Sequence, residues 1–364
     1  MDGVLPKQHI IDMVRKGWIL SSPNIEKDQF QPASLDLRLG TKAWRVRASF
    51  LAGIDSTVEQ KLTEFEMHQI DLIPGAVLEK GCVYVVPLFE RLALPPKVEA
   101  TANAKSSTGR LDLLTRIIID SGTEFDRINR GYSGPLYAEI CPRSFSVLVR
   151  PGMRLNQIRF REGDSELSDK ELLELHKKEK LVSGTALIDG GIGFSVDLLA
   201  KTNQLVGYKA KPHTGIIDLD RVNEYSPGDF WEELISKDGR IILDPGAFYI
   251  LVSRETVHIP PLFAAEMAPY LAMVGEFRVH YAGFFDPGFG HSKVGGNGSK
   301  GVLEVRCHEA PFALEHGQIV GRLVYERMKE EPTDLYGSAI ASNYQGQGLK
   351  LSKHFKTRTK SSLF

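Results

Sequence analysis

The sequence predicts a mainly β protein made of two similar domains, because short apolar runs and the same motifs occur in both halves. Matching residues lie 165 positions apart: Gly81 and Gly246, Tyr84 and Tyr249, Glu139 and Glu304, Gly152 and Gly317. Upstream of these pairs, the motif SLDLRLG at 34–40 is echoed by FSVDLLA at 194–200. A repeat of this length indicates a duplicated domain rather than an array of small repeats.

Apolar runs of roughly four to eight residues, separated by Gly, Pro, Asn and Asp, predict the strands of both halves. In the first half they cover 83–88, 113–119, 136–140 and 157–160, and in the second half 248–253, 275–281, 301–307 and 319–326. Strands with this spacing favour a sandwich or a barrel over alternating strands and helices.

Two short helices are also predicted. Apolar residues between Ile10 and Val14 have helical spacing and are followed by Gly17. Ser168 and Glu171 form a capping box ahead of a leucine-rich run. The second helix separates the repeats, so we predict a first domain at 1–165, a helical linker at 166–183 and a second domain at 184–364.

Composition excludes several classes of protein. The formal net charge is -1, which indicates neither a nucleic-acid partner nor an anionic membrane surface. The three cysteines show no CxxC spacing and favour a reduced, intracellular protein over a disulfide framework. No apolar run approaches the roughly 20 residues of a membrane span, and the N-terminus lacks a secretory signal. We therefore expect a cytoplasmic protein with no membrane partner.

The segment KSSTGR at 105–110 is the sharpest local signal for chemistry. Two adjacent hydroxyls, a glycine and a cation at each end can together bind a polyphosphate through charge-assisted hydrogen bonds. The order of residues is not that of a Walker A loop. Taken alone, such a segment is more often an ordinary surface loop.

The surroundings of this segment resemble the dCTP deaminase family, which belongs to the trimeric dUTPase-like superfamily. The resemblance rests on QPASLDLRLG at 31–40, KSSTGR and DRINRGYSGPLYAEI at 126–140, and the duplication is similar to that of a longer bacterial form. It implies two dUTPase-like distorted β-barrels of the β-clip type with a few short helices. It also implies a homo-oligomer whose active sites lie between domains or subunits.

The resemblance carries residue roles onto positions that match the family's motifs. It implies that the triphosphate is bound by Lys105, Ser106, Ser107 and Arg110, that Arg127 contacts substrate, and that Glu139 is the catalytic carboxylate. Asp36 is assigned to the phosphate or sugar end by the same analogy. From the residues alone, Glu139 could face solvent and Arg127 could be a surface ion-pair group.

The two copies are incomplete in different places. At the positions that match KSSTGR, the second half reads YLAMVG at 270–275, which cannot hold a tetra-anion. The first half has Asn-Arg-Gly at 129–131 where the family shows Asp-Pro-Gly, which the second half keeps at 286–288. Two candidates for the catalytic carboxylate are therefore open. Glu139 is preferred because Arg127 accompanies it, and Glu304 is the alternative.

The C-terminal segment SNYQGQGLKLSKHF at 342–355 resembles the family's closing lid, in which Tyr344 and Gln347 would contact nucleotide. The segment is polar and punctuated by glycine, so we expect too little apolar area for a place in a core. Removing the chain from Tyr344 onward should then reduce turnover without unfolding either domain.

The resemblance implies hydrolysis of dCTP to dUTP and ammonia, with dCTP, dUTP and dTTP as ligands. A dUTPase, or a bifunctional deaminase and diphosphatase, is the second interpretation, and a non-catalytic nucleotide sensor is the third. Mg²⁺ is expected to arrive with the triphosphate. No zinc is expected, because the H-x-E…P-C-x-x-C pattern is missing and Cys307-His308-Glu309 has no partner ligands at usable spacing.

Overall fold

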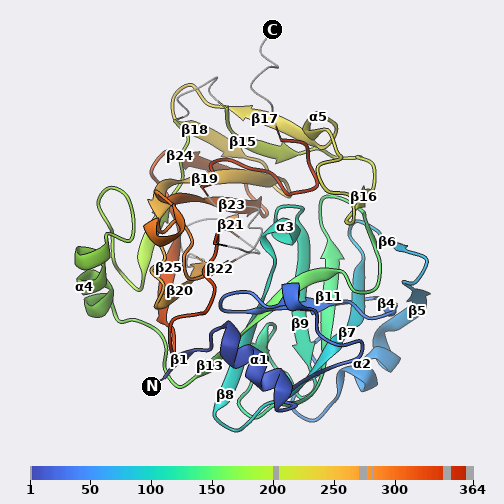
Figure 1. Ribbon diagram of the computed structural model, residues 1–364. Coiled ribbons are helices and arrows are strands. Elements are labelled where there is room, and N and C mark those ends of the chain that lie inside the picture. Colours follow the sequence, from blue (N-terminus) through green and yellow to red (C-terminus); the bar gives the residue numbers. More distant parts are fainter. Residues whose placement is uncertain (1, 200–204, 270–276, 280–282, 339–345, 358–364) are drawn as a thin grey trace.

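Two β-rich halves pack against each other in the computed structural model, as Figure 1 shows. The structure describes residues 2–199, 205–269, 277–279, 283–338 and 346–357. In the first half the helices are α1 (Lys7–Arg15), α2 (Val58–Phe65) and α3 (Ser106–Gly109). The strands of this half are β1 (Gly3–Val4), β2 (Ile19–Ser21), β3 (Leu35–Arg38), β4 (Lys42–Val46), β5 (Glu66–Asp71), β6 (Ala76–Leu78), β7 (Val83–Ala93), β8 (Val98–Ala104), β9 (Leu113–Ile119), β10 (Arg127–Ile128), β11 (Ser133–Pro142), β12 (Val147–Val149) and β13 (Arg154–Glu162).

The second half follows the connecting helix α4 (Asp169–Glu179) and contains the short helix α5 (Pro227–Phe230). Its strands are β14 (Ile192–Ser195), β15 (Leu205–Ala210), β16 (Ile217–Asp218), β17 (Trp231–Ile235), β18 (Arg240–Leu243), β19 (Phe248–Val257), β20 (Phe263–Pro269), β21 (Phe277–Val279), β22 (Phe284–Phe285), β23 (Ser299–Cys307), β24 (Phe312–Glu315) and β25 (Ile319–Arg327). No helix in the described ranges is long and apolar enough to cross a membrane.

The sheets confirm the duplicated, mainly β fold. One sheet of the first half has the order β1-β13-β8-β10, and the other has β5-β4-β7-β11-β9. The second half repeats this arrangement as β14-β25-β20-β22, in which β14 pairs with β25 as β3 pairs with β13, and as β17-β15-β19-β23-β21. Strand β19 is the counterpart of β7, and β23 is the counterpart of β11, as the constant spacing of the repeat predicts.

Both predicted helices and the predicted strands are present. Ser168 is the N-cap of α4, and its hydroxyl and the Glu171 side chain bond reciprocally to each other's backbone N–H, which is the predicted capping box. The first helix ends at Arg15, two residues before Gly17. Of the strand predicted at 275–281, the structure describes Phe277–Val279 as β21, and the flanking positions lie outside the described residues.

One face of β23 turns away from the core of its own half and packs on the first half. Leu303 and Val305 belong to the hydrophobic core of the second half. Val302, two positions from Glu304, belongs instead to the core that includes Phe145 of the first half. Because successive strand residues point to opposite faces, the even-numbered residues of β23 face the first half.

A second contact between the halves is ionic and joins the sheet of β13 to the sheet of β25. Arg159 and Arg161 on β13 both bond to Glu326 on β25, with Nη–Oε2 distances of 3.2 and 2.8 Å. Arg159 is fully buried and also donates to the Ala265 carbonyl at 3.1 Å. Buried charges of this kind require partners, and these partners come from the other half of the chain.

Candidate functional site

The KSSTGR segment at 105–110 is called the phosphate segment below, after its predicted role. It lies at the junction of the two halves, where α3 connects β8 to β9 (Figure 1). Lys105 is the N-cap of α3, and its carbonyl accepts the N–H of Thr108 at 2.8 Å. In this single helical turn, Ser106 and Arg110 are four residues apart and lie on one face. Ser107 and Thr108 lie on the other face, toward a pocket.

Arg110 ties the segment to the C-terminal tail and, through it, to the second half. The guanidinium is 3% exposed and donates to Gln347 Oε1 and to the Lys350 carbonyl, both at 2.9 Å. Gln347 in turn donates to the Lys300 carbonyl at 3.2 Å, at the start of β23. The predicted phosphate residue and the predicted lid residue are therefore in direct contact.

Glu304 lies on the face of β23 that packs on this junction. It is 3% exposed, and its cross-strand neighbour Ile250 belongs to the core shared with the first half. Two positions further along the same face, Arg306 forms a buried ion pair with Asp112, two residues after Arg110. The strand therefore runs past the phosphate segment with Glu304 between Lys300 and Arg306.

Glu139 occupies the equivalent position of the first half, but its surroundings differ. Its carboxylate accepts the Ser49 hydroxyl at 2.6 Å and Arg116 Nη2 at 2.5 Å. The side chain is 2% exposed, and its strand neighbours Tyr137 and Val85 pack in a small cluster under residues 50–65. Within the described chain, the first half's own segment at 47–65 covers the face that in the second half meets the phosphate segment.

Sequence reasoning did not identify the helix in this segment, although a signal was present. Thr57 and Gln60 form a capping box at the start of α2. Val58 and Leu62 follow at helical spacing, and both are buried under the helix. The apolar face of such a helix packs against another part of the protein, which here is the surface around Glu139.

The remaining predicted residues lie apart from this junction or outside the described chain. Arg127 is 62% exposed and pairs with Glu124 at 2.8 Å, the surface ion pair that the residues alone allowed. Tyr344 lies outside the described residues. Tyr336, near the lid segment, packs its ring 5.6 Å from that of Phe289.

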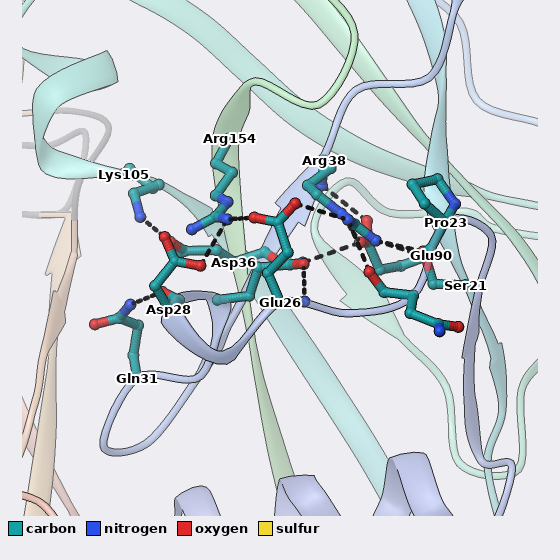
Figure 2. Close-up of polar contacts among 12 residues, drawn as sticks. Ser21, Pro23, Glu26, Asp28, Gln31, Asp36, Arg38, Glu90, Lys105 and Arg154 are labelled. Carbon is teal, nitrogen blue, oxygen red and sulfur yellow. Dashed lines mark hydrogen bonds and ion pairs between the residues drawn. The ribbon is translucent and has the colours of Figure 1, made fainter.

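Asp36 and Lys105 form the polar floor behind the phosphate segment (Figure 2). Asp36 is 1% exposed, and burial raises the pKa of its carboxyl group although Lys105 opposes the shift. Its Oδ2 accepts from Lys105, and its Oδ1 has no hydrogen-bond partner among the described residues. Arg154 lies beside the pair and bonds to Asp28 at 2.9 Å.

The expectation that the tail at 342–355 contributes nothing to a core is wrong. Leu351 and Phe355 are 8% and 4% exposed and belong to the larger hydrophobic core. The ring of Phe355 lies 5.5 Å from Phe230 and 5.8 Å from Trp231. The overall composition of the segment is polar and rich in glycine, so the expectation overlooked Leu351 and Phe355, which are four residues apart and both buried.

Metal ligands do not gather in the described part of the chain: no group of three or more His, Cys, Asp or Glu side chains is placed to hold an ion. Cys307 is buried, and its thiol donates to the Ala310 carbonyl at 3.1 Å.

Comparisons with known proteins agree with this architecture. Residues 1–164 match the family model described as the 2'-deoxycytidine 5'-triphosphate deaminase N-terminal domain, and 168–355 match the C-terminal domain of the same family. A crystal structure of 2'-deoxycytidine 5'-triphosphate deaminase from Agrobacterium tumefaciens is 55% identical, with a TM-score of 0.86. The match covers 90% of this chain and 99% of that one.

Shorter relatives match part of the chain. A dCTP deaminase from Halorubrum lacusprofundi is 28% identical over 44% of this chain and 77% of its own length. A dUMP-forming dCTP deaminase from Nanoarchaeum equitans is 27% identical over 49% of this chain and 93% of its own length.

The duplicated β fold and these matches define the chain as an enzyme of deoxynucleotide metabolism. It belongs to the dCTP deaminase family, because the two family models together match nearly the whole chain.

Proposed function

We propose that the protein hydrolyses dCTP to dUTP and ammonia at one composite site per chain, with Glu304 as the catalytic carboxylate. The observation that carries this proposal is the position of Glu304 on the face of β23 that packs on the phosphate segment. The first half then supplies Ser106, Ser107 and Arg110 for the triphosphate, and the second half supplies the reacting carboxylate. The losses in the two copies are complementary, so neither half needs a complete site.

Deamination at C4 of cytosine requires a general base and then a general acid. Glu304 takes a proton from water, the hydroxide adds to C4, and the tetrahedral centre collapses as the C4–N bond breaks. The carboxylic acid returns its proton to the departing amine, which leaves as ammonia. The proton of the C4 hydroxyl passes to N3, so the ring keeps a C4 carbonyl and an N3–H. One carboxylate can serve both steps, because the proton that it takes from water is the proton that it returns to the amine.

Arg110 and Gln347 would close the triphosphate end. The charged guanidinium already lies within hydrogen-bond distance of Gln347 and the tail. Charge-assisted bonds to phosphate oxygens are stronger than these bonds to neutral acceptors, so nucleotide competes well for the same donors. The bond from Gln347 to the Lys300 carbonyl would then keep the tail in place around the bound nucleotide.

Mg²⁺ is proposed to enter with the triphosphate rather than in a cage of protein ligands. Its preference for oxygen ligands and retained waters suits phosphate oxygens on one side and water on the other. The unpartnered Oδ1 of Asp36 fits a water molecule of that hydration shell, since a carboxylate oxygen is a good acceptor. The ion would screen the phosphate charges, and the protein's own residues would do the proton transfer.

Exchanging each glutamate separately tests the assignment. Glu304→Gln should bind dCTP but release ammonia at least a hundredfold more slowly, since a general base contributes roughly 10²–10⁴-fold. Glu139→Gln is the matched variant: it loses its charged bond to Arg116 and should become less stable, with turnover of the folded protein within about threefold. Loss of turnover in Glu139→Gln with Glu304→Gln active would reverse the assignment.

The products decide between the related activities. Ammonia with dUTP supports the proposal, whereas ammonia with pyrophosphate would indicate a dUMP-forming enzyme like the relative from Nanoarchaeum equitans. Nucleotide binding without ammonia release would indicate a sensor. The homo-oligomer stays a prediction that light scattering of the purified protein can test.

A further inference from the structure

A pocket of about 250 Å³ lies against the phosphate segment, with Lys105, Ser107 and Thr108 in its wall. Its walls come from five segments that are distant in sequence. Lys105 and Ser107 belong to the phosphate segment, Asp36 and Arg154 to two neighbouring strands, Asp220 to the second half, and Lys353 to the C-terminal tail. The tail and the phosphate segment therefore each form part of the pocket wall.

Three cationic groups line this pocket, and one of them has no carboxylate partner. Lys105 pairs with Asp36, and Arg154 pairs with Asp28 and Glu26. Lys353 forms no ion pair with any described residue. Burial lowers the pKa of its ammonium group, and the nearby charges of Lys105 and Arg154 lower it further, while the carboxylates of Asp36 and Asp220 oppose the shift. A half-buried ammonium held against two other cations indicates space for an anion.

Asp36 adds a second, independent indication of a ligand. Its carboxyl group is buried in the pocket wall, and within the described ranges Oδ1 has no hydrogen-bond partner. A buried acceptor without a partner costs free energy unless a ligand or water supplies a donor. The pocket therefore suits a ligand that brings both negative charge and a donor, as a phosphate with a hydrated cation does.

The tail runs beside the phosphate segment along its whole length. The Lys350 carbonyl accepts from Arg110 at 2.9 Å at one end. The Ser352 hydroxyl donates to the Ser107 carbonyl at 2.6 Å nearer the other end. Lys353 follows and lies at the Lys105 end. The tail therefore contributes Lys353 to the pocket wall while its Lys350 carbonyl stays bonded to Arg110.

We propose that this pocket receives the terminal phosphate of the nucleotide, and that Lys353 is a specificity-determining residue for triphosphates. The inference rests on the proposed function and extends it to the choice between dCTP, dCDP and dCMP. Arg110 would hold the inner phosphates, and Lys353 would contact a phosphate that the shorter nucleotides lack. The anchored tail is what brings this ammonium group to the pocket.

The test compares Lys353→Met with Lys356→Met, an exposed lysine on the same tail. Methionine keeps the length of the side chain and removes its charge. For Lys353→Met, the KM for dCTP should rise roughly ten- to hundredfold, as expected for one charge-assisted bond. The KM for dCMP should stay within about twofold, and Lys356→Met should resemble the unaltered protein with both nucleotides.

Direct binding separates this inference from the proposed function. Calorimetric titration with magnesium dCTP and with dCMP needs no turnover, so it tests the pocket even if no ammonia is released. Lys353→Met should fold, since it removes an unpaired buried charge, and Lys353→Gln provides a second neutral variant. Equal weakening of dCTP and dCMP, or unchanged dCTP affinity in both variants, would overturn the inference.

Discussion

Asp126 is a residue whose environment works against its charge. Its Oδ1 accepts the N–H of Ile117 at 2.7 Å, and its φ of 62° lies in the left-handed region. Burial of the carboxyl group raises its pKa to about 7, and this outweighs the backbone hydrogen bond and the charge of Arg116. Arg116 itself is paired with Glu139, and only its charge acts on Asp126.

Asp126→Asn should therefore stabilise the protein at high pH more than at low pH. The folded-state pKa of Asp126 lies above its ordinary value of 3.8, so ionisation on going from pH 4 to pH 7 costs the folded state stability. Asparagine removes that cost, keeps an acceptor for Ile117 and tolerates the left-handed conformation. Thermal midpoints at pH 5 and pH 8 should show the larger gain at pH 8.

The exposed Asp55, in the segment at 47–65, supplies the matched control for this comparison. Asp55→Asn should shift the midpoint equally and slightly at both pH values. The same gain for Asp126→Asn at pH 5 and pH 8 would mean that its carboxyl group does not titrate in this range.

At the scale of elements, the C-terminal tail is a packed strap rather than a loose lid. Tyr225 and Phe355 form a parallel β-bridge, and the N–H of Lys356 donates to the Tyr225 carbonyl at 2.8 Å. The buried His354 bonds to Ser352 and to the Leu219 carbonyl, and burial lowers the pKa of its imidazole to about 4. The tail is thus fixed to the second half on either side of Lys353.

Phe355→Ala should lower the free energy of unfolding by about 3–5 kcal/mol, the usual cost of removing a buried aromatic ring. It should also raise the KM for dCTP, because the tail would no longer hold Lys353 and Gln347 in place. Chemical denaturation measures the first effect, and steady-state kinetics the second. Thr357→Ala, at an exposed position two residues on, is the control. Unchanged stability in Phe355→Ala would restore the interpretation of a free lid.

Sequence patterns predicted elements well where one local rule decided them. The capping box at Ser168 and the spacing of Tyr84 and Tyr249 depend on neighbours in sequence or on a whole repeated motif. The environments of Glu139 and Glu304 do not, since both occupy the same position of the same repeat. What distinguishes them is which segment covers each strand face, a long-range contact that no local pattern specifies.

At the scale of the whole molecule, the two halves are joined by charge as well as by apolar packing. Glu326 accepts hydrogen bonds from Arg159, Arg161 and Ser165. Both arginines lie on β13 of the first half, and Ser165 follows that strand. Burial alone would raise the pKa of Glu326, but the guanidinium groups of Arg161 and Arg159 lower it to about 2. The composite site that we propose depends on this junction, because the first half supplies the phosphate segment and the second half supplies β23.

Glu326→Gln should therefore weaken the contact between the halves more than it weakens either barrel. The substitution leaves two buried guanidinium groups short of a counter-charge, which typically costs about 3–5 kcal/mol. In the unaltered protein, the lowered pKa contributes stability above about pH 4.5, and this contribution is lost as the pH falls toward 2. The variant lacks that contribution, so its stability should fall less steeply over the same range. Denaturation curves at pH 7 and pH 3, with the exposed Glu309→Gln as control, measure both effects. A variant as stable as the unaltered protein at pH 7 would show that the apolar contacts alone hold the halves together.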